Sequence, residues 1–583
     1  MTKPADFGAN GLTGSLDEAG RLIALNAYHP QHGYITLTAA DPFPETERYN
    51  PAAVRAYRAG LAELRGFGLQ FDQTPIERET SLLESAIPQT RLVFTGGAAD
   101  VTTFADDQGA AQIWNWRGLQ PRWAGRLSLQ RCAYTQLTEG GPLPMPPLEL
   151  RLSFADDVVI FENPALGAAA ALCGPKTGGQ TAAESRLPVE IALPVVGAGR
   201  AVLAYGFGQT ADEAASRARR LHNHAERCLQ ETLSAWRDRW RGIPDDPLAR
   251  RGLAYGLAMA VPVGETTCLL TDHMLLPLSW NRDAYYVARA LLAWGMRDVV
   301  RRHLLWMFEA AERPGGVWGR CYLANGQVKD AAFQLDQQLF PLLELAEYTL
   351  ETGDRDTLAR LQPFIPPLIE NLRARAANGL PLFPTDETPA DDPIALPYHL
   401  SSHILFWRAL ELLNKLVGGW EDLAAELRQA INHFFVAERD GQRLYAYATD
   451  GAGQFHFYHD ANDLPLALAP AWGFVPADDP VWRATVAFAF SAANVGGFYG
   501  GRLGSVHTRA PWPLGDVQDL IIARALGDSG RQMRARDRLR AAAAWDGALP
   551  EAADAETGAV VSRHWFAWPN AALACVDLGV FGV

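Results

Sequence analysis

The chain has 583 residues, which is more than one ordinary hydrophobic core accommodates, so we expect two or more domains. Hydrophobic residues make up 48% of the chain and charged residues 20%, a balance typical of a soluble globular protein with large cores. The formal net charge of -14 argues against nucleic acid and membrane surfaces as partners and favours an uncharged substrate.

The six cysteines are scattered, with no CxxC pair, so they predict buried reduced thiols and neither a metal site nor a disulfide framework. The first residues lack the apolar segment of a signal peptide, and no later run is long enough to span a bilayer. We therefore expect a cytoplasmic protein without a metal or cofactor. The sequence leaves open whether identical chains assemble into a homo-oligomer.

Residues 1–207 predict an antiparallel β-sandwich, because short alternating or β-branched runs are separated by Gly, Pro, Asp and Asn. One helix is expected at 51–65. Residues 208–245 predict a helical linker, with Thr210 as its N-cap and Glu213 completing a capping box. The strand runs are 34–37, 91–94, 112–116, 148–154, 158–161, 189–193 and 200–205.

Residues 246–583 predict a third domain that is nearly all helix, because apolar residues recur there at helical spacing. Alternate loops between the helices are long and rich in Trp, His, Asp, Glu, Gly and Pro, which is typical of loops that build a site on a rigid scaffold. The expected helices are 247–262, 283–296, 298–312, 335–351, 354–376, 401–416, 419–436, 463–470, 480–493, 515–526, 529–545 and 565–577.

The first informative segment holds Trp280, Arg282 and Asp283 at the start of an apolar helix. An indole can stack on the apolar face of a sugar ring while a charged pair binds its hydroxyls. The alternative is an ordinary helix N-terminus, where Asp283 favours the helix dipole and pairs with Arg282.

The second segment, 379–402, holds four carboxylates: Asp386, Glu387, Asp391 and Asp392. Like charges at short range raise the pKa of at least one member, and a protonated carboxyl is what a general acid requires. The alternative is that Asp391 and Asp392 are solvated loop residues and that Asp386 forms an Asx-turn.

The third segment, 494–516, is Gly-rich and then presents Ser505, His507, Arg509 and Trp512. Its glycines do not match a phosphate-binding loop. A Ser-His-Asp site built on Ser505 and His507 would also lack the GxSxG turn that such sites use.

The fourth segment, 547–568, places Glu551 before a turn that is followed by Arg563, Trp565 and Trp568. A single Glu is usually a surface residue, but its aromatic and cationic neighbours favour a site. Two carboxylates from different loops of one scaffold suggest glycoside hydrolysis, in which one protonates the leaving oxygen and the other acts as base or nucleophile.

Four ordered motifs resemble the exo-α-mannosidases of glycoside hydrolase family 125. They are Trp280 to Asp283 (WNRD), Pro384 to Glu387 (PTDE), Gly504 to Thr508 with Trp512-Pro513 (GSVHT…WP), and Pro550 to Ala552 with Ser562 to Trp568 (PEA…SRHWFAW). The resemblance covers about 245–583 and implies an (α/α)6 barrel. The N-terminal sandwich and linker instead resemble the layout of bacterial glucoamylases.

By this resemblance, Glu551 is the general base and Asp386 the general acid, although counting back from Pro397-Tyr398 places Asp391 or Asp392 in the acid position. The implied function is an inverting, exo-acting α-glycosidase for a terminal glucoside or mannoside, with the carboxylates about 6.5–9.5 Å apart. Asn462 and Asp463 are secondary candidates, the latter also a helix cap. The residues expected to bind the sugar are Trp280, Arg282, Asp283, Asp336, Glu387, Asp392, His507, Trp512, Arg563 and Trp565.

Two other functions fit the same residues. A disaccharide phosphorylase on this scaffold would keep one acid and replace the base by a phosphate pocket, for which Ser505, His507 and Arg509 are candidates. A carbohydrate-binding protein without catalysis would not require Glu551 opposite the acidic segment.

Overall fold

The chain divides into two compact units in the computed structural model. Unit 1 comprises Met1–Gly264, Leu270–Leu278 and Leu323–Asn325, and unit 2 comprises Glu265–Leu269, Ser279–Tyr322 and Gly326–Val583. The structure describes residues 3–47, 50–131, 143, 149–155, 157–177, 183–186, 188–195, 197, 199–274, 276–376 and 379–582.

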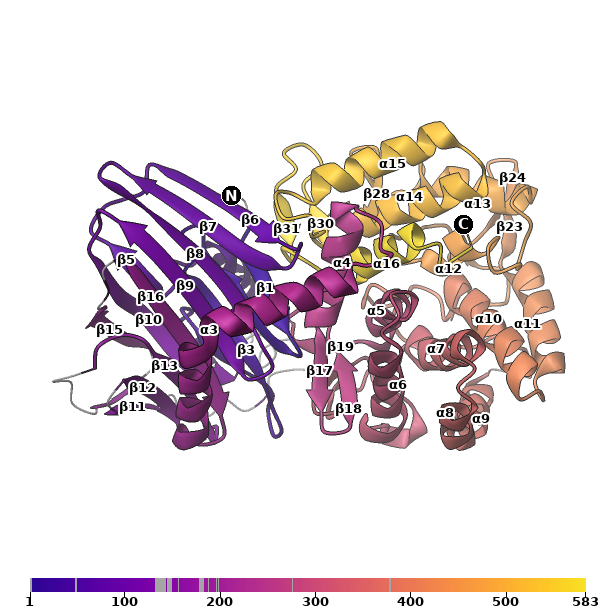
Figure 1. Ribbon diagram of the computed structural model, residues 1–583. Coiled ribbons are helices and arrows are strands. Elements are labelled where there is room, and N and C mark those ends of the chain that lie inside the picture. Colours follow the sequence, from indigo (N-terminus) through magenta and orange to yellow (C-terminus); the bar gives the residue numbers. More distant parts are fainter. Residues whose placement is uncertain are drawn as a thin grey trace. The chain divides into compact units, whose positions relative to one another are not determined.

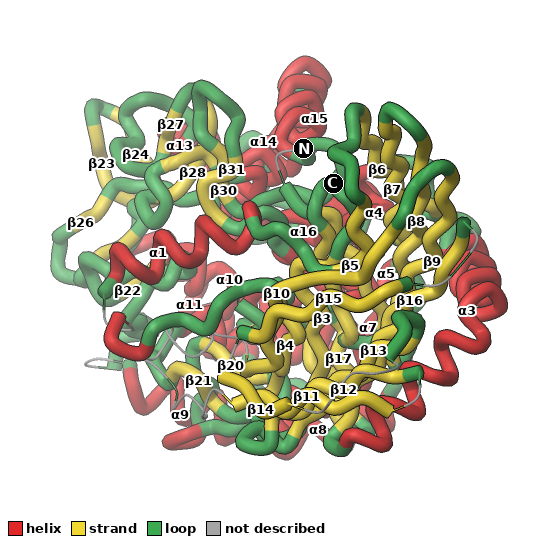
Figure 2. The backbone as a smooth tube through the Cα atoms, turned by 90° about the vertical axis from the view of Figure 1, so that its left-hand side faces the viewer, coloured by secondary structure: helices red, strands yellow, loops and turns green. Residues whose placement is uncertain are grey.

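Unit 1 contains two antiparallel sheets (Figures 1 and 2). The first has the order β1 (Ala5–Ala9), β2 (Leu12–Leu16), β3 (Leu22–His29), β4 (Gly33–Thr38), β10 (Pro121–Arg131) and β15 (Val189–Pro194), with β5 (Gly68–Phe71) also paired to β10. The second has the order β14 (Ala183–Arg186), β11 (Glu149–Ala155), β12 (Val158–Asn163), β13 (Ala168–Cys173), β16 (Arg200–Gly208), β9 (Gly109–Arg117), β8 (Gly97–Ala105), β7 (Ile87–Phe94) and β6 (Glu77–Leu83).

Buried side chains from the two sheets of unit 1 meet between them. The indole of Trp123 on β10 donates a hydrogen bond of 3.0 Å to the hydroxyl of Tyr205 on β16, and the ring of Phe67 contacts both. The described parts of all seven predicted runs fall within strands, whereas Leu148 lies outside the described residues. Antiparallel pairing is therefore confirmed for this region.

The segment predicted as a linker forms α3 (Ala211–Arg239), which packs along β16, β13, β12 and β9 (Figure 1). Ala214, Ala215 and Ala218 lie against Val158 and the alanines of β13, so the absence of long side chains allows the helix to approach the sheet closely. Thr210 caps the helix by accepting from the amide of Glu213, as predicted. The helices α1 (Pro51–Gly60) and α4 (Pro247–Ala258) also belong to unit 1.

Six helices of unit 2 form a closed ring, because each packs against the next and the last against the first. Their residues are almost all buried, which agrees with the apolar runs in the sequence. In ring order they are α5 (Asn281–Ala293), α7 (Leu335–Thr352), α10 (Leu400–Leu416), α12 (Leu464–Leu468), α14 (Pro513–Ala525) and α16 (Ala567–Asp577).

Further helices follow the ring helices in the chain: α6 (Arg297–Leu305), α8 (Arg355–Leu361), α9 (Ile365–Arg375), α11 (Glu421–Phe434), α13 (Pro480–Ala489) and α15 (Ser529–Ala542). The predicted helix at 354–376 is divided into α8 and α9 by a 3-10 turn at Gln362–Phe364. Pro363, Pro366 and Pro367 explain the division, since proline lacks the N–H that continues an α-helix. The predicted helix at 298–312 ends as one π turn at Trp306–Ala310.

The loops between the helices contain short strands that the sequence analysis does not predict. Each of the strands named below is two to four residues long, which is too short to show an alternating pattern of apolar and polar residues. They are β17 (Ala260–Val263), β18 (Thr266–Leu269), β19 (Leu278–Ser279), β20 (Cys321–Leu323), β21 (Val328–Asp330), β22 (Tyr398–His399), β23 (Val436–Arg439), β24 (Gln442–Tyr445), β25 (Ala448–Thr449), β26 (Phe455–His456), β27 (Phe498–Tyr499), β28 (Arg502–Ser505), β29 (Ala510–Pro511), β30 (Ala552–Ala553) and β31 (Val560–Ser562).

Candidate active site

A pocket in unit 2 collects residues from the N-terminal ends of the ring helices. The N-caps of α5, α14 and α16, which are Trp280, Trp512 and Phe566, all line it, and Asn462 precedes the N-cap of α12. Helix N-termini carry partial positive charge, so this end of the ring favours carboxylates. The lining residues are Trp280, Arg282, Asp283, Pro389, Ala390, Asp391, Asn462, His507, Trp512, Glu551, Arg563, Phe566 and Trp568.

Arg282 is a buried cation that lines the pocket. Its guanidinium lies 2.9 Å from Asp336, 3.2 Å from Asp391 and 3.7 Å from Asp283, and it stacks over the ring of Trp568 at 5.1 Å. Burial lowers the pKa of Arg282, but the carboxylates around it have the opposite and larger effect, so the pKa lies above its ordinary value. Arg282 therefore stays charged and orders the acidic groups around it.

The acidic loop places its carboxylates in different surroundings. Asp386 is exposed and does not line the pocket, whereas Asp391 lines it with its backbone held at a φ of +63°. Burial raises the pKa of Asp391, but Arg282, Arg320 and a hydrogen bond from Gln334 bring it below its ordinary value. Strained backbone and a perturbed carboxyl at one position are typical of functional residues.

Glu551 supplies a second carboxylate to the pocket from the segment before β30. It is 3% exposed, accepts a hydrogen bond from the hydroxyl of Ser562, and lies 3.3 Å from the guanidinium of Arg563. Arg563 also contacts the faces of Trp280 and Phe566. This cation favours the charged form of Glu551, which a base requires.

His507 faces both acidic segments. Its Nδ1 lies 3.2 Å from Asp392, and although burial lowers its pKa, the hydrogen bond to Asp392 and the charge of Glu551 raise it to about 9. The indole of Trp512, which lines the pocket beside His507, donates to the hydroxyl of Thr508 at 2.6 Å. A protonated His507 therefore lies between the acidic loop and Glu551 at neutral pH.

A buried group behind the pocket holds the loop that carries His507. The hydroxyl of Ser505 donates to Asp460 at 2.9 Å and accepts from the amide of His507 at 3.2 Å. Burial and the neighbouring Asp463 raise the pKa of Asp460 to about 6. The Ser505 hydroxyl is thus engaged inside the protein, and Arg509 is exposed and does not line the pocket.

The structure brings most of the predicted site residues to one pocket. Trp280, Arg282, Asp283, His507, Trp512, Glu551 and Arg563 line it. Asp336 and Asp392 lie one contact behind it, on Arg282 and His507 respectively. Glu387 is held by Arg320 and Gln334, and Asp386 and Trp565 are not among the lining residues.

Other lining residues carry weaker signals in the sequence. Trp568 lines the pocket, whereas Trp565 does not. Because Phe566 is the N-cap of α16, Trp568 lies in the first turn of the helix, where its ring packs on Arg282. The local sequence also gives no sign that Gln334, the N-cap of α7, contacts Arg282, Glu387 and Asp391. Such a contact between distant segments is visible only in the folded chain.

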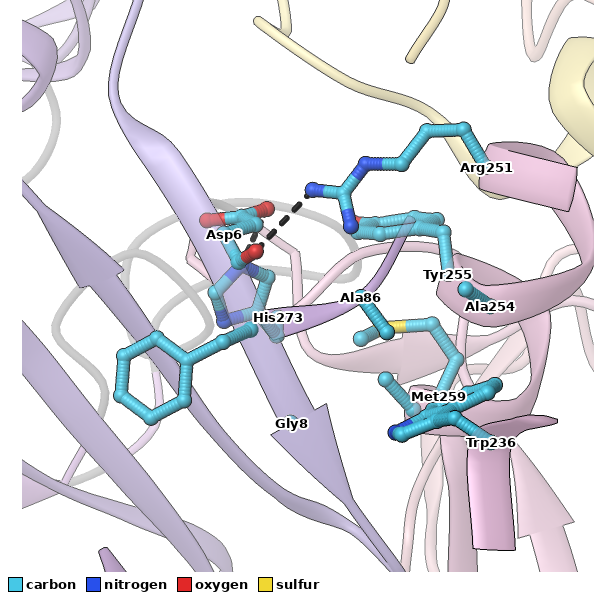
Figure 3. Close-up of a pocket in the computed structure, with 11 residues that line it drawn as sticks. Asp6, Gly8, Ala86, Trp236, Arg251, Ala254, Tyr255, Met259 and His273 are labelled. Atoms are coloured by element: carbon cyan, nitrogen blue, oxygen red, sulfur yellow. Dashed lines mark hydrogen bonds and ion pairs between the residues drawn. The ribbon is translucent and has the colours of Figure 1, made fainter. Parts of the chain in front are cut away.

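Unit 1 contains a second pocket, at the start of β1 (Figure 3). Arg251 points toward Asp6 and donates to its backbone carbonyl at 3.0 Å, and His273 lies 2.8 Å from the Asp6 carboxylate. Ser15 donates to the other oxygen of that carboxylate at 2.5 Å. Because both carboxylate oxygens bind protein groups, this pocket is interpreted as a structural ion-pair network.

The described residues contain no group of three or more His, Cys, Asp or Glu that could hold a metal ion. Within the same part of the chain, none of the helices is both long and apolar enough to cross a membrane. The five cysteines described are buried, as predicted, and Cys132 lies outside the described residues.

The mixed β and α fold is similar to that of a solved bacterial glucoamylase complexed with acarbose. The TM-score is 0.69 with 14% sequence identity, and the match covers 99% of this chain and 94% of that one. At this level of sequence identity the similarity shows a shared fold.

Residues 375–576 match the family model of the metal-independent alpha-mannosidases, GH125. The meiotically up-regulated gene 157 protein of Schizosaccharomyces pombe is 28% identical over 204 residues, which are 32% of this chain and 39% of that protein. The chain thus aligns with well under two thirds of that relative. A metal-independent α-mannosidase of Streptococcus pneumoniae, solved with α-1,6-mannobiose, is 19% identical with a TM-score of 0.49, over 60% of this chain and 97% of that one.

Proposed function

We propose that the protein is an exo-acting α-glycosidase that releases a terminal α-mannose or α-glucose with inversion at the anomeric carbon. The observation that carries this proposal is the meeting of Glu551 and the acidic loop at one aromatic pocket. The family match supports mannose, and the fold of the bacterial glucoamylase supports glucose. The proposal keeps residues 1–207 as the predicted sandwich, 208–245 as the helical linker and 246–583 as the predicted (α/α)6 barrel.

Glu551 is the proposed general base. Its charge is maintained by Arg563, and the hydroxyl of Ser562 fixes one of its oxygens. From this position it removes a proton from a water molecule that attacks the anomeric carbon, while the bond to the leaving oxygen breaks on the opposite face of the sugar. Trp280, Arg282 and Asp283 are proposed to bind the sugar ring and its hydroxyls.

Asp391 is the proposed general acid, in place of Asp386. A general acid must reach the glycosidic oxygen, and of these two carboxylates only Asp391 lines the pocket. Its lowered pKa is a property of the empty pocket, where Arg282 lies 3.2 Å from its Oδ1. Sugar hydroxyls that take over this guanidinium would raise the pKa and allow Asp391 to carry the proton.

The phosphorylase alternative finds less support. Its candidate phosphate ligands do not converge, because the Ser505 hydroxyl is bound to buried Asp460 and Arg509 is exposed. A carboxylate, Glu551, stands in the pocket where a phosphorylase would hold a phosphate anion. Water is therefore the favoured nucleophile.

The first experiment is incubation of the purified chain with maltose, isomaltose, kojibiose, trehalose and α-1,6-mannobiose, with and without phosphate, while NMR follows the anomer released. Release of a β-anomer in phosphate-free buffer is expected and identifies the sugar. Release of an α-anomer would contradict inversion, and turnover that requires phosphate would favour the phosphorylase.

A further inference from the structure

We infer that Gln334 is a positioning residue that fixes Oδ1 of Asp391, so that Oδ2 is the oxygen that carries the proton to the leaving group. This inference rests on the proposed role of Asp391 as general acid. Gln334 itself does not line the pocket.

The hydrogen bonds of Gln334 use its whole side-chain amide. The Nε2 group donates to Oδ1 of Asp391 at 2.7 Å and to Oε2 of Glu387 at 2.9 Å. The Oε1 atom accepts from the guanidinium of Arg282 at 3.1 Å and from Gln337 at 3.3 Å. The side chain is fully buried, so these partners replace water.

The orientation of the amide follows from its neighbours. Arg282 can only donate, so the atom beside it must be the amide oxygen, and the NH₂ group must face the two carboxylates. A flipped amide would place an acceptor against both carboxylates and a donor against a guanidinium. The network therefore permits one arrangement of Gln334.

The two oxygens of Asp391 differ as a result. Oδ1 accepts from both Gln334 and Arg282, whereas no hydrogen bond to Oδ2 is found among the described residues. A proton on Oδ1 would face two donors, which is unfavourable. When Asp391 is protonated, the proton is therefore expected on Oδ2, and transfer of this proton to the glycosidic oxygen leaves a carboxylate that Gln334 and Arg282 already stabilise.

The test is the Gln334→Glu variant. It replaces the donor by a carboxylate of the same shape, placed between Asp391 and Glu387, and like charges at this range raise the pKa of an acid. Titration of Asp391 by NMR with ¹³C-labelled aspartate, assigned by loss of its signal in Asp391→Asn, is expected to shift upward by about one to two pH units. The fall of kcat/KM on the alkaline side should move in the same direction.

Gln338→Glu is the matched control. Gln338 is equally buried on α7, but it binds only backbone groups of Trp318 and Gln334. The control is expected to lower stability without moving the Asp391 titration. If Gln334→Glu does not fold, Gln334→Ala removes the donor without adding charge and should shift the titration upward by a smaller amount.

An unchanged Asp391 titration in a folded Gln334 variant would overturn the inference. The NMR readout does not require activity, so its outcome is distinct from that of the proposed function. A chain that hydrolyses none of the sugars, yet shows the shifted titration, would retain the positioning role and lose the proposed reaction.

Discussion

Two acidic groups, the buried Asp6 in unit 1 and the partly exposed Asp391 in unit 2, differ in how their carboxylates are hydrogen-bonded. Asp6 accepts from Ser15 on one oxygen and pairs with His273 on the other. Asp391 accepts hydrogen bonds from Arg282 and Gln334 on the same oxygen, Oδ1, and it lines a pocket. Burial raises the pKa of Asp6 despite His273, whereas Arg282 and Arg320 outweigh burial at Asp391. Burial alone therefore does not distinguish a structural carboxylate from a candidate site residue, whereas the position of Asp391 in the pocket lining does.

The largest expected effect is the loss of activity when Glu551, the proposed general base, is replaced. Glu551→Gln keeps the shape of the side chain but cannot accept a proton from water, so kcat should fall by about 10³-fold or more. The exposed Glu556 on the same segment provides the control, and Glu556→Gln should retain full activity. Near-normal turnover by Glu551→Gln would disprove the two-carboxylate mechanism.

The next effect distinguishes the carboxylates of the acidic loop. Asp391→Asn should lower kcat on a disaccharide by about 10²- to 10⁴-fold, yet hydrolyse the corresponding glycosyl fluoride within about tenfold of wild type, because fluoride leaves without protonation. Asp386→Asn should have little effect on either substrate, since Asp386 lies outside the pocket. If Asp392→Asn shows the fluoride pattern instead, the acid is Asp392.

A smaller effect, on stability, concerns the buried pair of Asp6 and His273 in unit 1. His273→Ala leaves the Asp6 carboxylate buried without its imidazole partner, which should lower the free energy of unfolding by about 3 kcal/mol. His273→Gln keeps a hydrogen-bond donor and should lose less. Denaturant unfolding measures the change, while the kcat of the folded fraction is expected to stay close to wild type. A large loss of kcat would give this pair a catalytic role.

The smallest effect concerns Glu344, a buried acid that accepts no hydrogen bond from the residues that the structure describes. Glu344 on α7 is 1% exposed and lies 4.0 Å from His303, whose pKa burial lowers to about 4. Burial raises the pKa of Glu344 well above its ordinary value, although Arg289 opposes this. The native state therefore favours the protonated form, and its stability falls as pH rises above the unfolded-state pKa of about 4.3.

Replacement of that acid should consequently stabilise the protein. Glu344→Gln is expected to raise the free energy of unfolding by about 1 to 2 kcal/mol at pH 8 and by much less at pH 4. Unfolding measured at both pH values tests this. A gain that does not depend on pH would assign the effect to packing and not to protonation.

Much of the fold was predictable because its signals are local. Apolar residues at helical spacing predicted the ring helices to within a few residues, and Thr210 with Glu213 marked the start of α3. The short strands of the loops were missed, since pairs such as β30 and β31 form only when distant residues of the loop meet. The predicted domain boundaries at 207 and 245 stay a prediction.

The site divides in the same way. Trp280, Arg282, Asp283 and Glu551 are recognisable in the sequence because each lies beside the start of a ring helix or in a short motif. The sequence does not decide between Asp386 and Asp391 as the general acid, because both lie in one acidic loop segment. The choice depends on the backbone turn at Asp391 and on Arg282, more than a hundred residues away in the chain.

The sequence by itself indicated the proposed class of chemistry, through the residue types in its four loop segments, and it predicted the positions of the ring helices. The tertiary structure alone decided which carboxylate reaches the pocket, which tryptophan packs on Arg282, and that Gln334 joins them. The physical reason is that helix formation depends on neighbours three or four residues away, whereas a pocket depends on how the ends of six helices converge.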